Sequence, residues 1–522
     1  MPGTSKQAKL SRTESSIYAT LWIIAVFYSI YCFYSSPETQ FINYVDTYND
    51  FKPGWSFLNR KIDVSDEEWR LWIPLIYKLI PWIIVHIFIS QYLKYLCSDT
   101  AVIYIWYILI SILFLWNYFG LLSTLCTLLL PCISCLLTSL QSKSLSWLIH
   151  SITLVIINWA KVSDVIFMEW LLLTAEHHYI LTTAICWIQL RSISYSIDSI
   201  GMYKHIDTCG FFKDLLKNIA YCLYLPTLFL GPVILYQQFT DGIDKPFTAW
   251  NKTKIITTVY NVMRYSFWIL FTNICLHYLY FNALLFHGHI VAELSPWAFY
   301  GLGYCMGQYF LNKYVVVYGV VSIVCKAEDI EAPVQPKCIG RIHLYSDMWK
   351  HFDRGLYKFL LKYIYIPCNP KSSYGKFFAS ALCFAFIFLW HGLNFPIFIW
   401  AFLNFLGLLL ENIVKSTSAY FFEKILHNSL SPQNKRRLEC ILISPLLAFS
   451  AIANFYFLAG DQIGNMYIWR IIKDSWQINF ILLFILYCCC QTCIEIKQIE
   501  QMNSLKSRKD IEIKMYKKLS NF

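Results

Sequence analysis

The chain has 522 residues, of which 57% are hydrophobic, 18% are aromatic and only 14% are charged. Since a soluble domain is nearer a quarter charged, this composition excludes an ordinary soluble protein. The net charge of +11 is typical of basic cytoplasmic loops between membrane spans and does not indicate nucleic-acid binding.

The first predicted element is an apolar span near 16–34. The polar segment before it, 1–15, is basic, so we expect this segment to be cytoplasmic. The mixed-charge loop 35–70 then fits the lumenal side. Several later runs reach the roughly 18–20 residues that cross a ~30 Å hydrocarbon core. The apolar runs lie near 73–95, 101–118, 119–138, 145–160, 164–190, 218–236, 256–284, 297–325, 377–410, 439–459 and 478–496.

These runs are continuous and do not alternate as the strands of a membrane barrel would. In the run 218–236, Pro226 and the pair Gly231-Pro232 predict a broken helix, which membranes tolerate only where protein buries it or it lines a cavity. The lysine-rich tail, 497–522, is predicted to be cytoplasmic. We therefore expect an all-α polytopic membrane protein with about eleven membrane segments, one or two of them re-entrant.

His391 is the only histidine in the window 377–410, which contains no Asp, Glu, Lys or Arg. As one straight helix this window would be about 51 Å long, too long for a single untilted crossing. Helix-breaking residues occur at Gly392, Asn394 and Pro396, so we expect His391 at the end of a helix beside a kink. Imidazole there suits a general base, and the alternative is a packed histidine that donates to a backbone carbonyl.

Asp353 lies between Lys350 and Arg354. Spacing alone favours an interfacial carboxylate neutralised by these cations, because Lys350 lies three residues earlier on a predicted helix. The alternative is a carboxylate that orients a histidine or binds an incoming amine. Basic residues at four-residue intervals also predict one cationic helix face, formed by Lys350, Arg354, Lys358 and Lys362. Such a face suits a cytoplasmic interface, or a site for an anionic headgroup or nucleotide phosphates.

Several tryptophans and cysteines allow more than one interpretation of their role. Trp349, Trp390 and Trp400 either line an acyl tunnel or pack as core and belt aromatics. Cys338 is an acylated thiol, a metal or haem ligand, or an inert residue. The three consecutive cysteines at 488–490 lie near a predicted membrane end, where S-acylation is an alternative to an inert role.

Three stretches carry distinctive motifs, which read Met348-Trp349-x-x-Phe352-Asp353-x-Gly355-Leu356-Tyr357, then Trp390-His391-Gly392 with Leu403-Asn404-x-Leu406-Gly407, and Asn454-x-x-Phe457-Leu458-x-Gly460. These motifs resemble those of the membrane-bound O-acyltransferase family, and within it those of the Hedgehog acyltransferase branch in its insect form. The resemblance covers most of the chain. It implies a single membrane-embedded acyltransferase domain over 1–522, with 338–470 as its catalytic region.

The resemblance implies that His391 is catalytic, and non-catalytic paralogues of this branch lack that histidine. It also implies a catalytic role for Asp353, where this branch carries Asp and many other relatives carry Asn. One departure is Lys350, where the vertebrate enzyme has arginine. The charge is kept, but a planar bidentate donor is lost.

The motifs further imply that Trp349, Asn404 and Asn454 bind substrate. Cys338 resembles the cysteine that ligates haem iron in the vertebrate enzyme, which would make haem b a cofactor. The implied activity is transfer of palmitate from palmitoyl-CoA to the amino-terminal cysteine of a secreted Hedgehog-type protein. The implied location is the endoplasmic reticulum membrane, or the Golgi, with membrane lipids as partners. The alternatives are a family member that acylates a lipid or GPI-anchor precursor, and a transporter or scaffold without chemistry.

Overall fold

The computed structural model describes residues 8–42, 50–97, 99–201, 208–420 and 430–519. Residues 1–7 of the predicted cytoplasmic N-terminus and 520–522 of the predicted tail lie outside the described residues. The N-terminal half contains the helices α1 (Arg12–Ser35), α2 (Pro37–Phe41), α3 (Glu67–Leu96), α4 (Thr100–Phe119), α5 (Leu121–Ser139), α6 (Lys143–Val162), α7 (Asp164–Leu171), α8 (Ala175–Ser199), α9 (Thr208–Cys222) and α10 (Tyr236–Ile243). The C-terminal half contains α11 (Lys252–Tyr278), α12 (Phe281–Leu284), α13 (Gly288–Glu293), α14 (Pro296–Ala327), α15 (Tyr345–His351), α16 (Arg354–Leu360), α17 (Ser373–His391), α18 (Phe395–Tyr420), α19 (Pro432–Lys473) and α20 (Trp476–Leu519).

A small antiparallel hairpin is the one sheet within the described residues. Its strands are β1 (Phe51–Pro53) and β2 (Lys61–Asp63), with Phe51 opposite Asp63. The hairpin lies in the loop predicted to be lumenal. Asp63 is buried and accepts hydrogen bonds from the backbone N–H groups of Asn282 and Ala283, so it holds the start of α12.

Ten helices in the described part of the chain are long and apolar enough to cross a membrane. They are α1, α3, α4, α5, α6, α14, α17, α18, α19 and α20. Large apolar side chains such as Phe27, Phe88 and Trp159 are exposed on these helices, as expected for surfaces that contact lipid. The prediction of an all-α polytopic membrane protein is therefore confirmed.

Three predicted runs differ from simple spans. The run 164–190 divides into α7 and α8, because the chain leaves the helix at Leu172, which has a positive φ of 55°. The run 256–284 is covered by α11 and the short α12. The run 218–236 is broken after Cys222, as its prolines predict.

Protein buries the broken segment that follows Cys222. A buried guanidinium from α8, that of Arg191, donates to the carbonyl of Cys222 at 2.7 Å and to that of Thr227 at 2.6 Å. The hydroxyl of Tyr221 donates to the carbonyl of Ile234 at 2.6 Å. Backbone groups that lose their helical partners are thus satisfied inside the protein, as an apolar environment requires.

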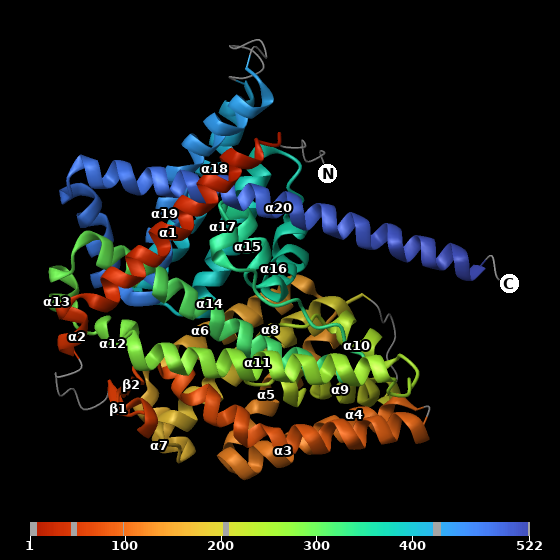
Figure 1. Cartoon of the computed structure of the whole chain (residues 1–522). Helices are drawn as coiled ribbons and strands as arrows, with labels where there is room; N and C mark the ends of the chain where they lie inside the picture. Colours follow the sequence, from red (N-terminus) through yellow and green to blue (C-terminus); the bar gives the residue numbers. More distant parts are fainter. Residues whose placement is uncertain (1–7, 43–49, 98, 202–207, 421–429, 520–522) are drawn as a thin grey trace.

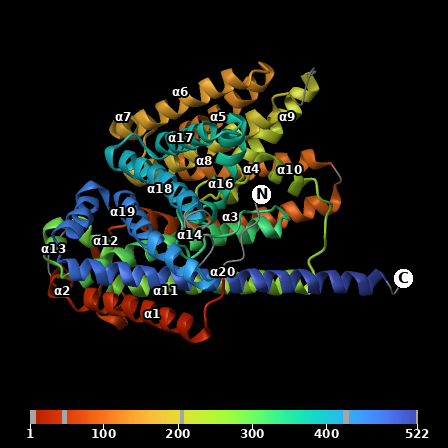
Figure 2. The same ribbon diagram turned by 90° about the horizontal axis from the view of Figure 1, so that it is seen from above.

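Helix α14 runs through the middle of the molecule (Figures 1 and 2) and contributes residues to two hydrophobic cores. Its first half packs into a core with α1, α11, α12, α13 and α19, through residues such as Phe299 and Leu302. Its second half packs into a larger core with α3, α4, α8, α9 and α16, through Val317 and Val321. Helix α14 therefore connects the two hydrophobic cores. Figures 1 and 2 also show α20 extending well beyond the other helices toward the C-terminus.

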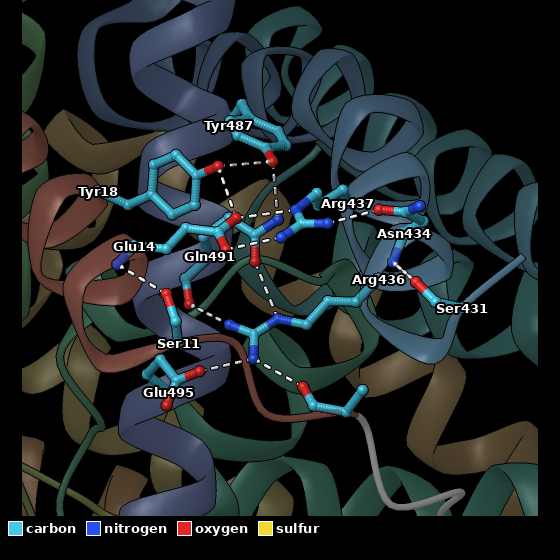
Figure 3. Close-up of polar contacts among 11 residues, drawn as sticks. Ser11, Glu14, Tyr18, Ser431, Asn434, Arg436, Arg437, Tyr487, Gln491 and Glu495 are labelled. Atoms are coloured by element: carbon cyan, nitrogen blue, oxygen red, sulfur yellow. Dashed lines mark hydrogen bonds and ion pairs between the residues drawn. The ribbon is translucent and has the colours of Figure 1, made fainter.

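Two arginines at the start of α19 join this helix to α1 and α20 (Figure 3). The buried guanidinium of Arg436 donates to the side chains of Gln491 and Glu495, and to the carbonyl of Ala8. That of Arg437 donates to both carboxylate oxygens of Glu14 at 2.8 and 2.7 Å. The N-terminal helix is thereby held against the C-terminal part of the fold.

Candidate active site

The window 377–410 forms an antiparallel pair of helices, α17 and α18, with a break between them. Helix α17 ends at His391, and Gly392 follows with a φ of 151°, which disfavours other residues. The side chain of Asn394 accepts a hydrogen bond from the N–H of Ile397, which caps α18. Pro396 lies in the first turn of α18, where its missing N–H costs nothing. The predicted end of a helix at His391, beside a kink, is confirmed.

Aromatic rings surround the imidazole of His391. Its ring centre lies 4.8 Å from that of Trp390 and 5.2 Å from those of Trp400 and Phe457. These rings come from α17, α18 and α19. The imidazole is only partly exposed, so it lies in an apolar setting where a neutral base can act.

Unpaired polar atoms lie beside this aromatic group. Trp349 packs on Trp400 with ring centres 5.7 Å apart, and its indole N–H is buried with no partner among the described residues. Asn404 donates to the carbonyl of Trp400, and its own side-chain oxygen is likewise buried and unpaired. Asn454 accepts from the indole N–H of Trp400 at 3.1 Å. Because buried polar groups are normally hydrogen-bonded, the free atoms of Trp349 and Asn404 are available to a bound ligand.

Asp353 lies at the start of α16 and makes two well-formed hydrogen bonds. One carboxylate oxygen accepts from the hydroxyl of Tyr318 on α14 at 2.7 Å, and the other accepts from the N–H of Leu356 at 2.9 Å. Burial raises the pKa of Asp353, and both hydrogen bonds act against that rise. The spacing-based interpretation, in which Lys350 neutralises this carboxylate, is wrong, because Asp353 points to a tyrosine and a helix terminus.

The predicted cationic helix face is interrupted. The chain leaves the helix at Phe352 and Asp353, so Lys350 lies on α15 while Arg354 and Lys358 lie on α16. Lys362 lies in the following π-helix, Leu361–Tyr365, and pairs with Asp198 at 2.8 Å. Lys350 and Lys358 remain exposed to solvent.

A chain of ring contacts connects the surroundings of His391 with those of Asp353. Phe457, which contacts His391, lies 5.5 Å from Phe310 on α14. Phe310 stacks on Phe352 with ring centres 5.4 Å apart, and Phe352 immediately precedes Asp353. The two predicted catalytic residues therefore border one aromatic cluster. Neither Phe310 nor Tyr318 was predicted as a site residue, because aromatic residues in an apolar span carry no distinguishing signal.

Cys338 lies in the segment between α14 and α15, just before a short turn of 3-10 helix, Ile339–Arg341. Its thiol is partly exposed and lies 3.9 Å from the side-chain oxygen of Gln308. The amide nitrogen of Gln308 is buried and has no hydrogen-bond partner in the described part of the chain. A partly exposed thiol of this kind would be able to hold a haem iron as a thiolate. Among the described residues no group of three or more His, Cys, Asp or Glu forms a metal cluster. The cysteines at 488–490 are buried, which disfavours their S-acylation.

Residues 121–453, more than half of the chain, match the model described as MBOAT, membrane-bound O-acyltransferase family. The chain belongs to the membrane-bound O-acyltransferase family. The match includes His391, Asp353 and the break between α17 and α18.

Individual relatives of this family match almost the whole chain. Protein-cysteine N-palmitoyltransferase Rasp of Drosophila melanogaster is 31% identical, with 87% of this chain and 89% of that protein covered. Protein-cysteine N-palmitoyltransferase HHAT of Mus musculus is 24% identical over 82% of this chain and 87% of that protein. Protein-cysteine N-palmitoyltransferase HHAT-like protein of the same organism is 25% identical over 84% and 86%. The expected membership of the acyltransferase family is confirmed.

Proposed function

We propose that this protein transfers palmitate from palmitoyl-CoA to the amino-terminal cysteine of a secreted Hedgehog-type protein and forms an amide. The observation that carries the proposal is the imidazole of His391, presented at a broken helix end among aromatic rings. Similarity over nearly the full length to two proteins named protein-cysteine N-palmitoyltransferase supports the choice of donor and acceptor.

In the proposed reaction, the amine nitrogen attacks the carbonyl carbon of the thioester. A C–N bond forms, the C–S bond breaks, and the CoA sulfur leaves. His391 accepts the proton that the amine loses and returns it to the departing thiolate. General base catalysis of this kind contributes about 10²–10⁴-fold, and positioning supplies the rest. Asp353 binds the amino terminus or orients the reacting groups.

The remaining predicted residues bind the substrates. The unpaired indole N–H of Trp349 and the unpaired oxygen of Asn404 meet polar groups of the acyl donor. Asn454 belongs to the same substrate-binding site, where it also holds Trp400 in place. The aromatic cluster next to His391 accommodates the acyl chain. The exposed cations Lys350 and Lys358 attract the phosphates of CoA.

The proposed location is the endoplasmic reticulum membrane, with membrane lipids around the outer helix faces. Segments 1–15 and 497–522 lie on the cytosolic side, from which CoA enters, and the protein acceptor arrives from the lumen. We include haem b as a proposed cofactor, held by the thiol of Cys338, which would supply an iron–thiolate bond there. No catalytic step depends on it.

The experiment incubates the purified protein in lipid nanodiscs with palmitoyl-CoA and a peptide that begins with cysteine. Mass spectrometry is expected to find an amide-linked palmitoyl group, and none on the same peptide with an acetylated amino terminus. His391→Ala is expected to abolish turnover.

Asp353→Asn provides the matched comparison for Asp353. Asparagine caps a helix as well as aspartate does, so stability is retained while at least a tenfold loss of turnover is expected from the missing charge. Acylation of a lysolipid in place of the peptide would instead support the lipid or GPI-precursor alternative. Solute flux in liposomes without any acyl transfer would support a transporter.

A further inference from the structure

The end of α17 leaves backbone groups that the helix itself cannot satisfy. The last carbonyls of any helix lack partners within it. After His391 the chain also turns sharply at Gly392. The N–H of Gly392 still donates to the carbonyl of Phe388, but the N–H of Leu393 loses its helical partner. In an apolar environment such groups must find partners elsewhere in the protein.

Asn158, on α6, supplies partners on both sides of this break. Its side-chain amide donates to the carbonyl of Leu389 at 2.7 Å and to that of Leu154 at 2.8 Å. Its side-chain oxygen accepts from the N–H of Leu393 at 3.1 Å. Only 4% of Asn158 is exposed, so water does not compete for these bonds. One side chain therefore connects the residues before and after His391.

Lys161 lies three residues further along the same face of α6. Its ammonium group lies 3.3 Å from the carbonyl oxygen of His391 and 3.4 Å from that of Trp390. A cation at the C-terminal end of a helix also interacts favourably with the helix dipole. Lys161 thus caps the carbonyls that α17 leaves unpaired.

Helix α8 holds this segment from a second direction. The indole N–H of Trp390 donates to the carbonyl of Cys186 at 3.2 Å, and its ring packs against that of Trp187. All of these contacts with the end of α17 are made to backbone groups or by the side chain of Trp390. The imidazole of His391 is left free to face Trp400 and Phe457.

We propose that Asn158 and Lys161 are positioning residues that fix the backbone of His391 and so aim its imidazole at the reacting groups. This inference rests on the proposed function, in which His391 is the base. A base acts only within a narrow range of distances and angles, and a displacement of about 1 Å can cost 10²-fold in rate. The two side chains do not touch the substrate.

The test compares Asn158→Leu and Lys161→Met with two controls on the same helix. Lys143→Met removes an exposed lysine, and Ser146→Ala removes a buried hydroxyl that has no partner among the described residues. The two positioning variants are expected to lower kcat by about 10-fold to 100-fold, with the KM for palmitoyl-CoA within about twofold of the parent value. Lys161→Arg keeps a cationic donor and is expected to restore most of kcat.

Amide hydrogen exchange supplies a second measurement. Both positioning variants are expected to speed exchange in residues 389–395 and to leave the rest of the chain at the parent rate. Unchanged kcat in both variants would overturn the proposal. So would a loss of kcat together with faster exchange throughout the chain, because that pattern describes general destabilisation.

His391→Ala separates this proposal from the proposed function. If it abolishes turnover while Asn158→Leu and Lys161→Met retain full kcat, only the positioning role fails. If it retains turnover, the catalytic role of His391 fails. Faster exchange confined to residues 389–395 would then still identify Asn158 and Lys161 as the groups that hold this backbone.

Discussion

At the scale of single residues, the carboxylate of Asp353 has two hydrogen-bond partners beside its proposed chemical role. Its two oxygens hold the first turn of α16 and the hydroxyl of Tyr318. The sequence alone favoured Lys350 as its partner, because that residue is close in the chain. Tyr318 is 35 positions away, and only the packing of α14 against α16 brings the two together. A partner set by tertiary structure cannot be predicted from spacing.

The substitution Tyr318→Phe is expected to change the pH dependence of the enzyme. The hydroxyl of Tyr318 hydrogen-bonds the carboxylate and favours its ionised form, against the burial that raises the pKa of Asp353. Without the hydroxyl that pKa rises further, so the acidic limb of the profile of kcat/KM against pH moves to higher pH. Profiles of parent and variant measure the shift. An unchanged or downward-shifted limb would contradict the assigned role.

At the scale of elements, buried polar side chains supply hydrogen-bond partners to backbone groups where helices end or break. Arg191 supplies partners to the segment after Cys222, Asp63 to the start of α12, and Asn158 to the end of α17. Each polar side chain is buried and comes from a distant part of the chain. Breaks of this kind are where an apolar bundle can place irregular backbone at depth.

Arg191→Met is expected to lower the free energy of unfolding by about 3 kcal/mol, because two buried carbonyls lose a charged donor. Denaturant titration in mixed micelles measures the change. Arg264→Met is the control, since that arginine is exposed on α11 and the loss there is expected to stay below about 0.5 kcal/mol. Equal effects of the two substitutions would show that the hydrogen bonds of Arg191 to the broken segment do not stabilise the fold.

The sequence predicted the helix breaks better than it predicted the side chains that hydrogen-bond the backbone at those breaks. Gly392, Asn394 and Pro396 are residues whose backbone preferences act locally, so the end of α17 could be placed in advance. The break between α15 and α16 has no glycine or proline and was missed. Asn158 and Lys161 carry only a weak signal, as polar residues at the end of an apolar run.

At the scale of the whole molecule, two arginines join the N-terminal helix to the C-terminal helices (Figure 3). The side chain of Arg436 is 1% exposed and that of Arg437 is 36% exposed. A buried charged donor leaves its partners unsatisfied when it is removed, whereas a pair open to solvent loses little. The two neighbouring positions should therefore differ in their contribution to stability.

Arg436→Met is expected to destabilise the protein by about 3 kcal/mol, and Arg437→Met by no more than about 1 kcal/mol. Thermal unfolding followed by tryptophan fluorescence ranks the two variants. High salt should weaken only the contribution of the exposed pair between Arg437 and Glu14. A larger loss for Arg437→Met would show that the buried network does not hold the termini.

The proposed palmitoylation of an amino-terminal cysteine depends on His391. Its most direct test is the intact mass of a secreted Hedgehog-type protein co-expressed with this chain, with its His391→Ala variant, or with neither. We predict a hydroxylamine-resistant, amide-linked palmitoyl group on the first cysteine with the parent chain only. Palmitate found equally with His391→Ala would contradict the catalytic role of His391, and its absence with the parent chain would contradict the proposed activity.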